Sequence, residues 1–83
     1  MELRDTVDGM LSEDYEERFK AELDQLEIRC AKLDKTVEDW DAGQLGFEPK
    51  CSRELLMAQL GAMTAYANVL LERARAEGID VSR

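Results

Sequence analysis

The chain has 83 residues, a net charge of −8 and no histidine. The missing histidine excludes Cys/His zinc sites and the Glu-x-x-His di-iron pattern. The negative charge argues against binding of long nucleic acids, which needs a basic face. No apolar run approaches the about 20 residues that span a bilayer, and no signal peptide is recognisable. We therefore expect one soluble, cytoplasmic domain over residues 1–83, without membrane, metal or cofactor.

The first half predicts two helices. Leu3, Val7 and Met10 have helical spacing, which favours a short amphipathic helix over about 2–9. Ser12 is expected to cap a long helix over about 13–41, with acidic residues in its first turn. The apolar residues of this helix alternate in steps of four and three, as in a heptad seam: Phe19, Leu23, Leu26, Cys30, Leu33, Val37 and Trp40.

The second half predicts a loop and another long helix. Gly43, Gly46 and Pro49 place a loop at about 42–51. Ser52 is expected to cap a helix over about 53–77, and Gly78 to end it. Two long helices joined by a short loop form an antiparallel hairpin. The predicted fold class is therefore all-α: a helical hairpin with a short N-terminal helix.

The second long helix has more apolar surface than a lone hairpin needs. One apolar line comprises Leu56, Leu60, Met63, Ala67, Leu70 and Ala74, and a second comprises Leu55, Ala62, Val69 and Ala76. A chain this small gains stability from assembly, so the surplus predicts a homo-oligomer. Between the two lines runs a polar column: Gln59, Tyr66 and Arg73. These residues are either half-buried side chains at the edge of a packing face, or a ligand pocket between subunits.

A second column of polar residues flanks the seam of the first long helix. It comprises Arg18, Glu22, Gln25, Arg29, Lys32 and Thr36. One interpretation is a solvated flank with ion pairs at helical spacing. The other is a wall that binds an anion through its Arg and Lys residues. Helix register decides whether the two columns meet in one pocket, and the sequence leaves this open.

Catalysis has little support in the sequence. Without histidine there is no Ser/His or Cys/His pair, and the carboxylates lie on an outward face. Cys30 is on the buried seam, where a thiol is usually inert, and Cys51 is too distant along the hairpin for a disulfide. We therefore expect a binding protein with no catalytic residue.

Two segments resemble small bacteriophage-encoded helical-hairpin proteins. The first reads Leu11-Ser12-Glu13-Asp14-Tyr15-Glu16-Glu17-Arg18-Phe19-Lys20-Ala21-Glu22, with Gln25-Leu26 and Arg29. The second contains Leu56, Gln59-Leu60, Ala62-Met63, Tyr66, Val69-Leu70, Arg73-Ala74 and Glu77-Gly78-Ile79. Together they span about 11–79, and they are similar to the hairpin domain of phage anti-CBASS and anti-Thoeris sponges.

The resemblance implies a non-catalytic protein in the cytoplasm of an infected bacterial host. Such sponges sequester cyclic-nucleotide immune signals, either cyclic oligonucleotides or cyclic ADP-ribose isomers, in pockets between subunits of an oligomer, often a hexamer. The ligand-contacting residues of those sponges do not align with this chain. The candidate ligand-binding residues therefore rest on the two columns: Arg18, Gln25, Arg29, Lys32, Gln59, Tyr66 and Arg73.

Two other functions remain open at this point. The wide apolar face would also suit a small helical adaptor or inhibitor that binds a protein partner. A purely structural helical oligomer is the third possibility.

Overall fold

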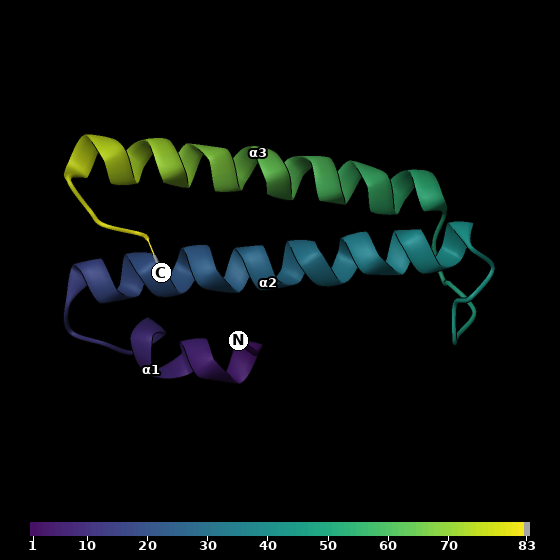
Figure 1. Cartoon of the computed structure of the whole chain (residues 1–83), viewed down its shortest axis with the longest axis horizontal. Coiled ribbons are helices and arrows are strands. Elements are labelled where there is room, and N and C mark those ends of the chain that lie inside the picture. Colours follow the sequence, from purple (N-terminus) through teal and green to yellow (C-terminus); the bar gives the residue numbers. More distant parts are fainter. Residues whose placement is uncertain (83) are drawn as a thin grey trace.

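The computed structural model describes residues 1–82 and contains helices only over this range. A 3-10 turn, η1 (Leu3–Thr6), leads into α1 (Val7–Met10), and two long helices follow, α2 (Tyr15–Asp41) and α3 (Arg53–Glu77). Figure 1 shows α2 and α3 running antiparallel, with η1 and α1 along the other side of α2. Helix α2 is thus the middle layer and contacts every other element. The all-α hairpin with a short N-terminal helix is confirmed.

The start of α2 differs slightly from the expected one. The helix begins at Tyr15, and its N-cap is Asp14, whose carboxylate accepts the Glu16 N–H at 3.1 Å. Ser12 was the expected cap. Its hydroxyl instead accepts the Asp14 N–H at 3.0 Å and donates to Glu17 at 2.5 Å. Ser12 therefore shapes the turn before the helix, because Asp14 lies closer to the first free N–H groups.

Both ends of α3 follow from local chemistry. The Ser52 hydroxyl caps the helix by accepting the Leu55 N–H at 3.1 Å. At the other end Gly78 adopts a left-handed backbone with a φ of 71°, which glycine reaches at no steric cost. The Ile79 N–H then donates to the Ala74 carbonyl at 2.8 Å, and the Ile79 side chain folds back into the core.

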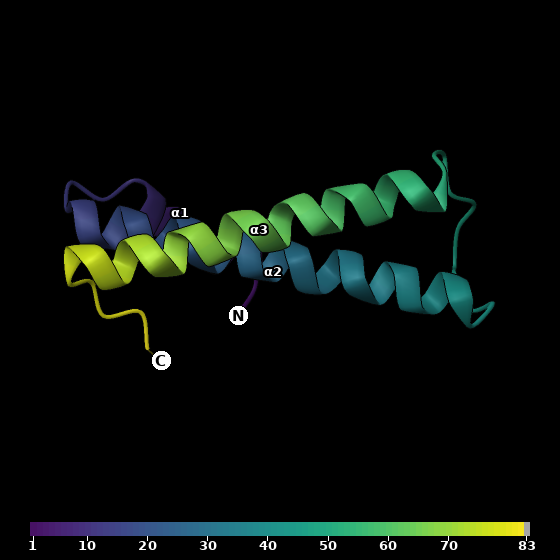
Figure 2. The ribbon, with the colours of Figure 1, turned by 90° about the horizontal axis from the view of Figure 1, so that it is seen from above.

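The buried core lies at one end of the hairpin, where α2 begins and α3 ends. Its members are Phe19, Leu23, Leu26, Leu70, Ala74 and Ile79, with Met63, Ala67 and Val81 packed against them. Leu70 is the most deeply buried, with 1% of its surface exposed. Seen from above, α2 and α3 cross at an angle: they overlap at this end and are displaced sideways toward the loop (Figure 2), whereas in the perpendicular view of Figure 1 they come closer together toward the loop.

The N-terminal segment packs closely on the back of α2. A Cβ placed on Gly9 would lie 2.9 Å from the Cβ of Ala21, closer than real Cβ atoms approach. Glycine at this position therefore lets α1 lie directly against α2. Thr6 is 3% exposed, and its hydroxyl donates to the Leu3 carbonyl at 2.7 Å.

The second apolar line of α3 is solvent-exposed in the single chain. Leu55 is 62% exposed and Val69 53%, because only the first line faces α2. Neither long helix, nor any other in residues 1–82, has an apolar stretch long enough to cross a membrane. The homo-oligomer that we expect from this surface stays a prediction.

Candidate functional site

An open cleft of about 300 Å³ lies between the start of α2 and the last turns of α3. Its lining combines two guanidinium groups, two aromatic rings and a carboxylate: Tyr15, Arg18, Phe19, Glu22 and Arg73. The cleft sits directly above the buried core, since Phe19 belongs to both. The core therefore gives the cleft a fixed floor.

Arg73 is held at the mouth of this cleft by three contacts. Its Nε donates to Glu77 Oε2 at 3.2 Å, and its Nη2 donates to the Tyr15 hydroxyl at 3.0 Å. Its guanidinium carbon lies 5.2 Å from the centre of the Phe19 ring, within range of a cation–π contact. The hydrogen bond to Glu77 raises the pKa of Arg73 above its usual value. The group is thus a permanent, oriented cation whose side chain is still 48% exposed.

Tyr15 and Glu77 complete the mouth of the cleft. The Tyr15 hydroxyl donates to Glu77 Oε1 at 2.6 Å, and its ring stacks on Phe19 with centroids 6.3 Å apart. This hydrogen bond raises the pKa of Tyr15 and, with Arg73, lowers the pKa of Glu77. Tyr15 therefore stays protonated and Glu77 stays ionised near neutral pH, and both fix the position of Arg73.

Tyr66 and Glu22 are in contact seven residues further along each helix toward the loop. The Tyr66 hydroxyl donates to Glu22 Oε2, and the Tyr66 ring remains 45% exposed. Glu22 is half-buried and belongs to the cleft lining. Tyr66 thus borders the cleft through this carboxylate.

Arg18 reaches the cleft from the α2 side. Its Nη1 donates to the Ser12 carbonyl at 2.8 Å, which ties the side chain to the turn between α1 and α2. The remaining N–H groups of this guanidinium are available to a ligand. The structure therefore brings three of the seven candidate residues together: Arg18, Tyr66 and Arg73.

The other four candidate residues lie elsewhere. Gln25 donates to Met10 Sδ at 3.0 Å, and Lys32 pairs with Glu2 at 3.7 Å, so both face the N-terminal segment. Gln59 donates only to Met63 Sδ, at 3.8 Å, and lies about 21 Å from Arg73 along α3. Arg29 is exposed and makes no ion pair within residues 1–82.

The contacts across the hairpin repeat every seven residues. Tyr15 contacts Arg73, and seven residues further along each helix Glu22 contacts Tyr66. Another step of seven places Arg29 opposite Gln59, but no hydrogen bond joins this pair in the described part of the chain. The register therefore joins the two polar columns at the core end of the hairpin.

Sequence reasoning missed four contributors to the site: Tyr15, Phe19, Glu22 and Glu77. The sequence places Phe19 in the seam and Glu22 in the flank, and Tyr15 and Glu77 stand out only as members of the resembling segments. A seven-residue step links Tyr15 to Glu22 and Tyr66 to Arg73. That periodicity was the available signal. It shows which residues share a face of one helix, but the contacts across the hairpin also depend on the register between α2 and α3.

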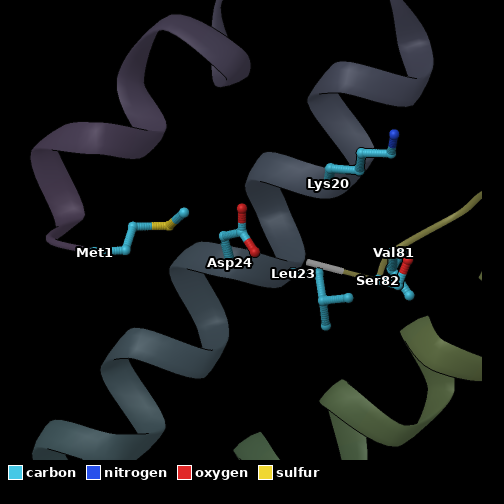
Figure 3. Close-up of a pocket in the computed structure, with 6 residues that line it drawn as sticks. All are labelled: Met1, Lys20, Leu23, Asp24, Val81 and Ser82. Carbon is cyan, nitrogen blue, oxygen red and sulfur yellow. The ribbon is translucent and has the colours of Figure 1, made fainter.

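Two further hollows are less suited to an anion. Figure 3 shows one beside the N-terminus, of about 110 Å³, where Lys20 and Leu23 point in opposite directions and no polar groups converge. The other, of about 360 Å³, lies on the opposite flank of the hairpin. It is mainly apolar and carries two acidic residues, Glu27 and Asp34. In residues 1–82 no cluster of three Cys, Asp or Glu residues could hold a metal ion.

Comparison with known proteins supplies the family. The comparisons with curated proteins and with solved structures gave no match. A family model named Sequestin matches residues 13–76, from the turn before α2 to the last turn of α3. The matched region contains the whole cleft lining and most of the 83 residues. The name describes sequestration of a molecule, a binding role rather than a catalytic one, and the chain belongs to the Sequestin family.

Proposed function

We propose that this protein is a phage anti-defence sponge that binds a cyclic nucleotide and holds it without changing it chemically. The observation that supports the proposal is the cleft that Arg18 and Arg73 both line, beside the exposed rings of Tyr15 and Tyr66. Guanidinium groups bind phosphate oxygens through paired N–H donors. An aromatic ring that stacks on a base contributes roughly 1–3 kcal/mol. A nucleotide carries both of these features.

The charge of the whole chain favours a compact anion over a long one. The net charge is −8, and a duplex or long single strand would contact many of the acidic residues outside the cleft. A cyclic di- or trinucleotide, or a cyclic ADP-ribose isomer, is small enough to contact only the cleft and its rim. The ligand would thus meet the local positive groups and avoid the acidic surface.

We place the complete pocket between subunits of a homo-oligomer. The cleft is open to solvent, and the exposed apolar line with Leu55 and Val69 lies beside the polar column of α3. A second copy packed on this line would bury apolar surface and close the cleft. The resemblance to phage sponges favours a hexamer and a cytoplasmic site of action in the infected host.

The four candidate residues outside the cleft fit such an assembly. Gln59 and Arg29 lie too far along the hairpin to reach a ligand that Arg73 holds in the same subunit. We propose that they contact a ligand held mainly by the neighbouring subunit. Gln25 and Lys32 would join the rim only if they exchanged their contacts with Met10 and Glu2 for the ligand.

The exposed apolar line also favours a second function. A helix of another protein could pack on Leu55 and Val69, which would make the chain an adaptor or inhibitor. The two proposals differ in what stabilises the protein. A sponge is stabilised by a small molecule, whereas an adaptor is stabilised only by its protein partner.

A thermal-shift screen of the full chain tests the proposal. The ligands are cyclic dinucleotides, cyclic trinucleotides and cyclic ADP-ribose isomers, with their linear counterparts as controls. A ligand present at 100 times its Kd stabilises the folded state by about 2.7 kcal/mol. We expect at least one cyclic compound to raise Tm clearly. If none does, the sequestration of a cyclic nucleotide is wrong.

A further inference from the structure

The face of α3 opposite α2 is left uncovered in the single chain. Helix α3 contacts α2 and no other helix of residues 1–82. The residues of the uncovered face recur in steps of three and four, and all of them are exposed. We call this set the outer face: Leu55, Ala58, Ala62, Ala65, Val69, Glu72 and Ala76. Such spacing is typical of a helix that packs along its length on another helix.

Two charges beside the outer face indicate which helix fits it. Glu54 lies in the first turn of α3 and Arg75 in its last turn, and both are exposed. Within one chain they are about 31 Å apart along the helix, so their side chains cannot meet. A second copy of α3 that runs antiparallel would place each Glu54 beside the partner subunit's Arg75. The outer face is therefore complementary in charge to itself.

The same alignment pairs large side chains of the outer face with small ones. With the two charges side by side, Val69 would lie opposite the partner subunit's Ala58. Leu55 would lie against the methylene groups of the partner subunit's Glu72, whose carboxylate can reach solvent at the end of the interface. A parallel copy would instead place Glu72 against its own counterpart, and like charges are costly in an apolar interface. Charge and size thus both favour the antiparallel direction.

We propose that the outer face binds a second copy of this chain in the antiparallel direction and that the pair completes the ligand site. The pairing brings Gln59 beside the partner subunit's Tyr66, because both lie in the polar column that borders the outer face, on either side of the centre of the pair. The amide of Gln59 then reaches a ligand held in the partner subunit's cleft. The pairing stands on the outer face alone, whereas the shared pocket rests on the proposed function.

Reversal of the two charges tests the pairing without any ligand. Glu54→Arg places two arginines together at each end of the pair, and Arg75→Glu places two carboxylates together. Attraction becomes repulsion at both ends, so the Kd of self-association should rise about tenfold in either variant. The double variant has opposite charges again and should return to a Kd near that of the native chain. Analytical ultracentrifugation of the full chain measures all four proteins.

Glu38→Arg is the matched control, because Glu38 is exposed on α2 and its reversal changes the net charge as much as Glu54→Arg does. It should associate like the native chain. Both variants make the net charge of −8 less negative, so weaker association in Glu54→Arg alone cannot come from general repulsion. Removal of one charge, as in Arg75→Ala, adds no repulsion and should leave assembly nearly unchanged at high protein concentration. Circular dichroism should show native helix content in every variant.

A native chain that stays monomeric, single variants that associate like the native chain, or a double variant as weak as either single one would overturn the pairing. Because the two residues are too far apart to meet within one chain, rescue in the double variant requires contact between subunits. A parallel pair would not respond to the single reversals in this way.

The shared pocket has a separate measurement. The probe is the cyclic compound that gives the largest thermal shift in the screen above, and titration calorimetry gives its affinity. Gln59→Ala removes one hydrogen-bonding group, so this affinity should fall about threefold to tenfold while the Kd of self-association stays native. An unchanged affinity would overturn the shared pocket. Failure of every cyclic nucleotide to bind would overturn the proposed function and leave the antiparallel pairing to be decided by the charge reversals.

Discussion

The two ends of the hairpin differ in how much of their apolar surface the single chain buries and how many of their polar groups it hydrogen-bonds. The core end has the buried cluster around Leu70, the packed N-terminal segment and the hydrogen-bonded cleft. Toward the loop α3 has no buried residue, and it exposes Leu55. The core end therefore contains the buried cluster of the single chain and positions the site. Toward the loop the apolar surface of α3 is left exposed.

The largest expected effect is loss of the core end. Leu70→Ala removes a side chain that is 1% exposed, and substitutions of this kind cost about 2–5 kcal/mol. The total free energy of unfolding of a small domain is not much larger than this cost. Urea denaturation followed by circular dichroism should show a much lower midpoint. Leu55→Ala, at 62% exposure, is the control at the loop end and should change the midpoint little under conditions that dissociate the assembly.

The second effect concerns the exposed line of α3. Val69 is 53% exposed, so Val69→Asp should leave the fold of the single chain intact. In the proposed homo-oligomer it would place a charge in an apolar interface, which is costly. Sizing chromatography with light scattering should show dissociation, and circular dichroism should show unchanged helix content. If the native chain is already monomeric at high concentration, the exposed line does not mediate self-assembly and this expectation is wrong.

The third effect concerns Arg73 at the mouth of the cleft. Arg73→Ala removes a guanidinium that Glu77, Tyr15 and Phe19 hold in place. A charged hydrogen bond contributes about 1.5–3 kcal/mol, so affinity for a cyclic nucleotide should fall at least tenfold. Assembly should be unchanged. Arg75→Ala, on an exposed position in the same last turn of α3, should bind normally. Loss of assembly in Arg73→Ala would make the residue structural instead.

The fourth effect concerns Gly9, where α1 meets α2. Gly9→Ala places a Cβ 2.9 Å from that of Ala21, so the N-terminal segment must shift. Overpacking costs about 1–3 kcal/mol, partly offset by about 1 kcal/mol of helix propensity. The unfolding free energy should fall by about 1 kcal/mol. Gly61→Ala meets no atom within 4 Å in the single chain and should not destabilise a dissociated chain.

The smallest expected effect is the pH dependence of the two ends. The pKa of Glu77 is lowered by Tyr15 and Arg73, and the pKa of Asp41 is lowered by Arg53, which binds it with two contacts of 2.8 Å. A lowered pKa in the folded state stabilises the fold above the unfolded value. That stability is lost as pH falls through the folded value.

Acid titration of unfolding should therefore show stability declining below the usual values of 4.5 for Glu and 3.8 for Asp. Glu77→Gln should reduce the slope of the decline at the core end. Asp41→Asn should do the same at the loop end. Both carboxylates are exposed, so each change should be modest. A decline that is identical in both variants and the native chain would show that these contacts contribute nothing.

The sequence predicts the hairpin well because each element carries its own signal. The seam from Phe19 to Trp40, the cap at Ser52 and the stop at Gly78 all act within a few residues. The surplus apolar line of α3 was equally visible, since it depends only on helical spacing. These features need no knowledge of how the helices align.

The site was harder to predict because it depends on register. Whether Arg18 and Arg73 share a cleft is decided by how α2 slides against α3, and a shift of one turn would separate them. The flank of α2 also divides between partners, because Gln25 donates to Met10 of α1 and Lys32 pairs with Glu2 of the terminal segment. Nothing in the sequence distinguishes Glu22 and Glu77 from the rest of the 19 Asp and Glu residues, so their place in the site also follows only from the register.

The central claim is that the protein removes a cyclic nucleotide from solution and returns it unchanged. The most direct measurement mixes the purified chain with the compound that gives the largest thermal shift, separates free from bound compound, and then denatures the protein. Mass spectrometry of both fractions should show depletion of the free compound and full recovery of the intact molecule after denaturation. A converted product, or no depletion at an excess of protein, would contradict the account.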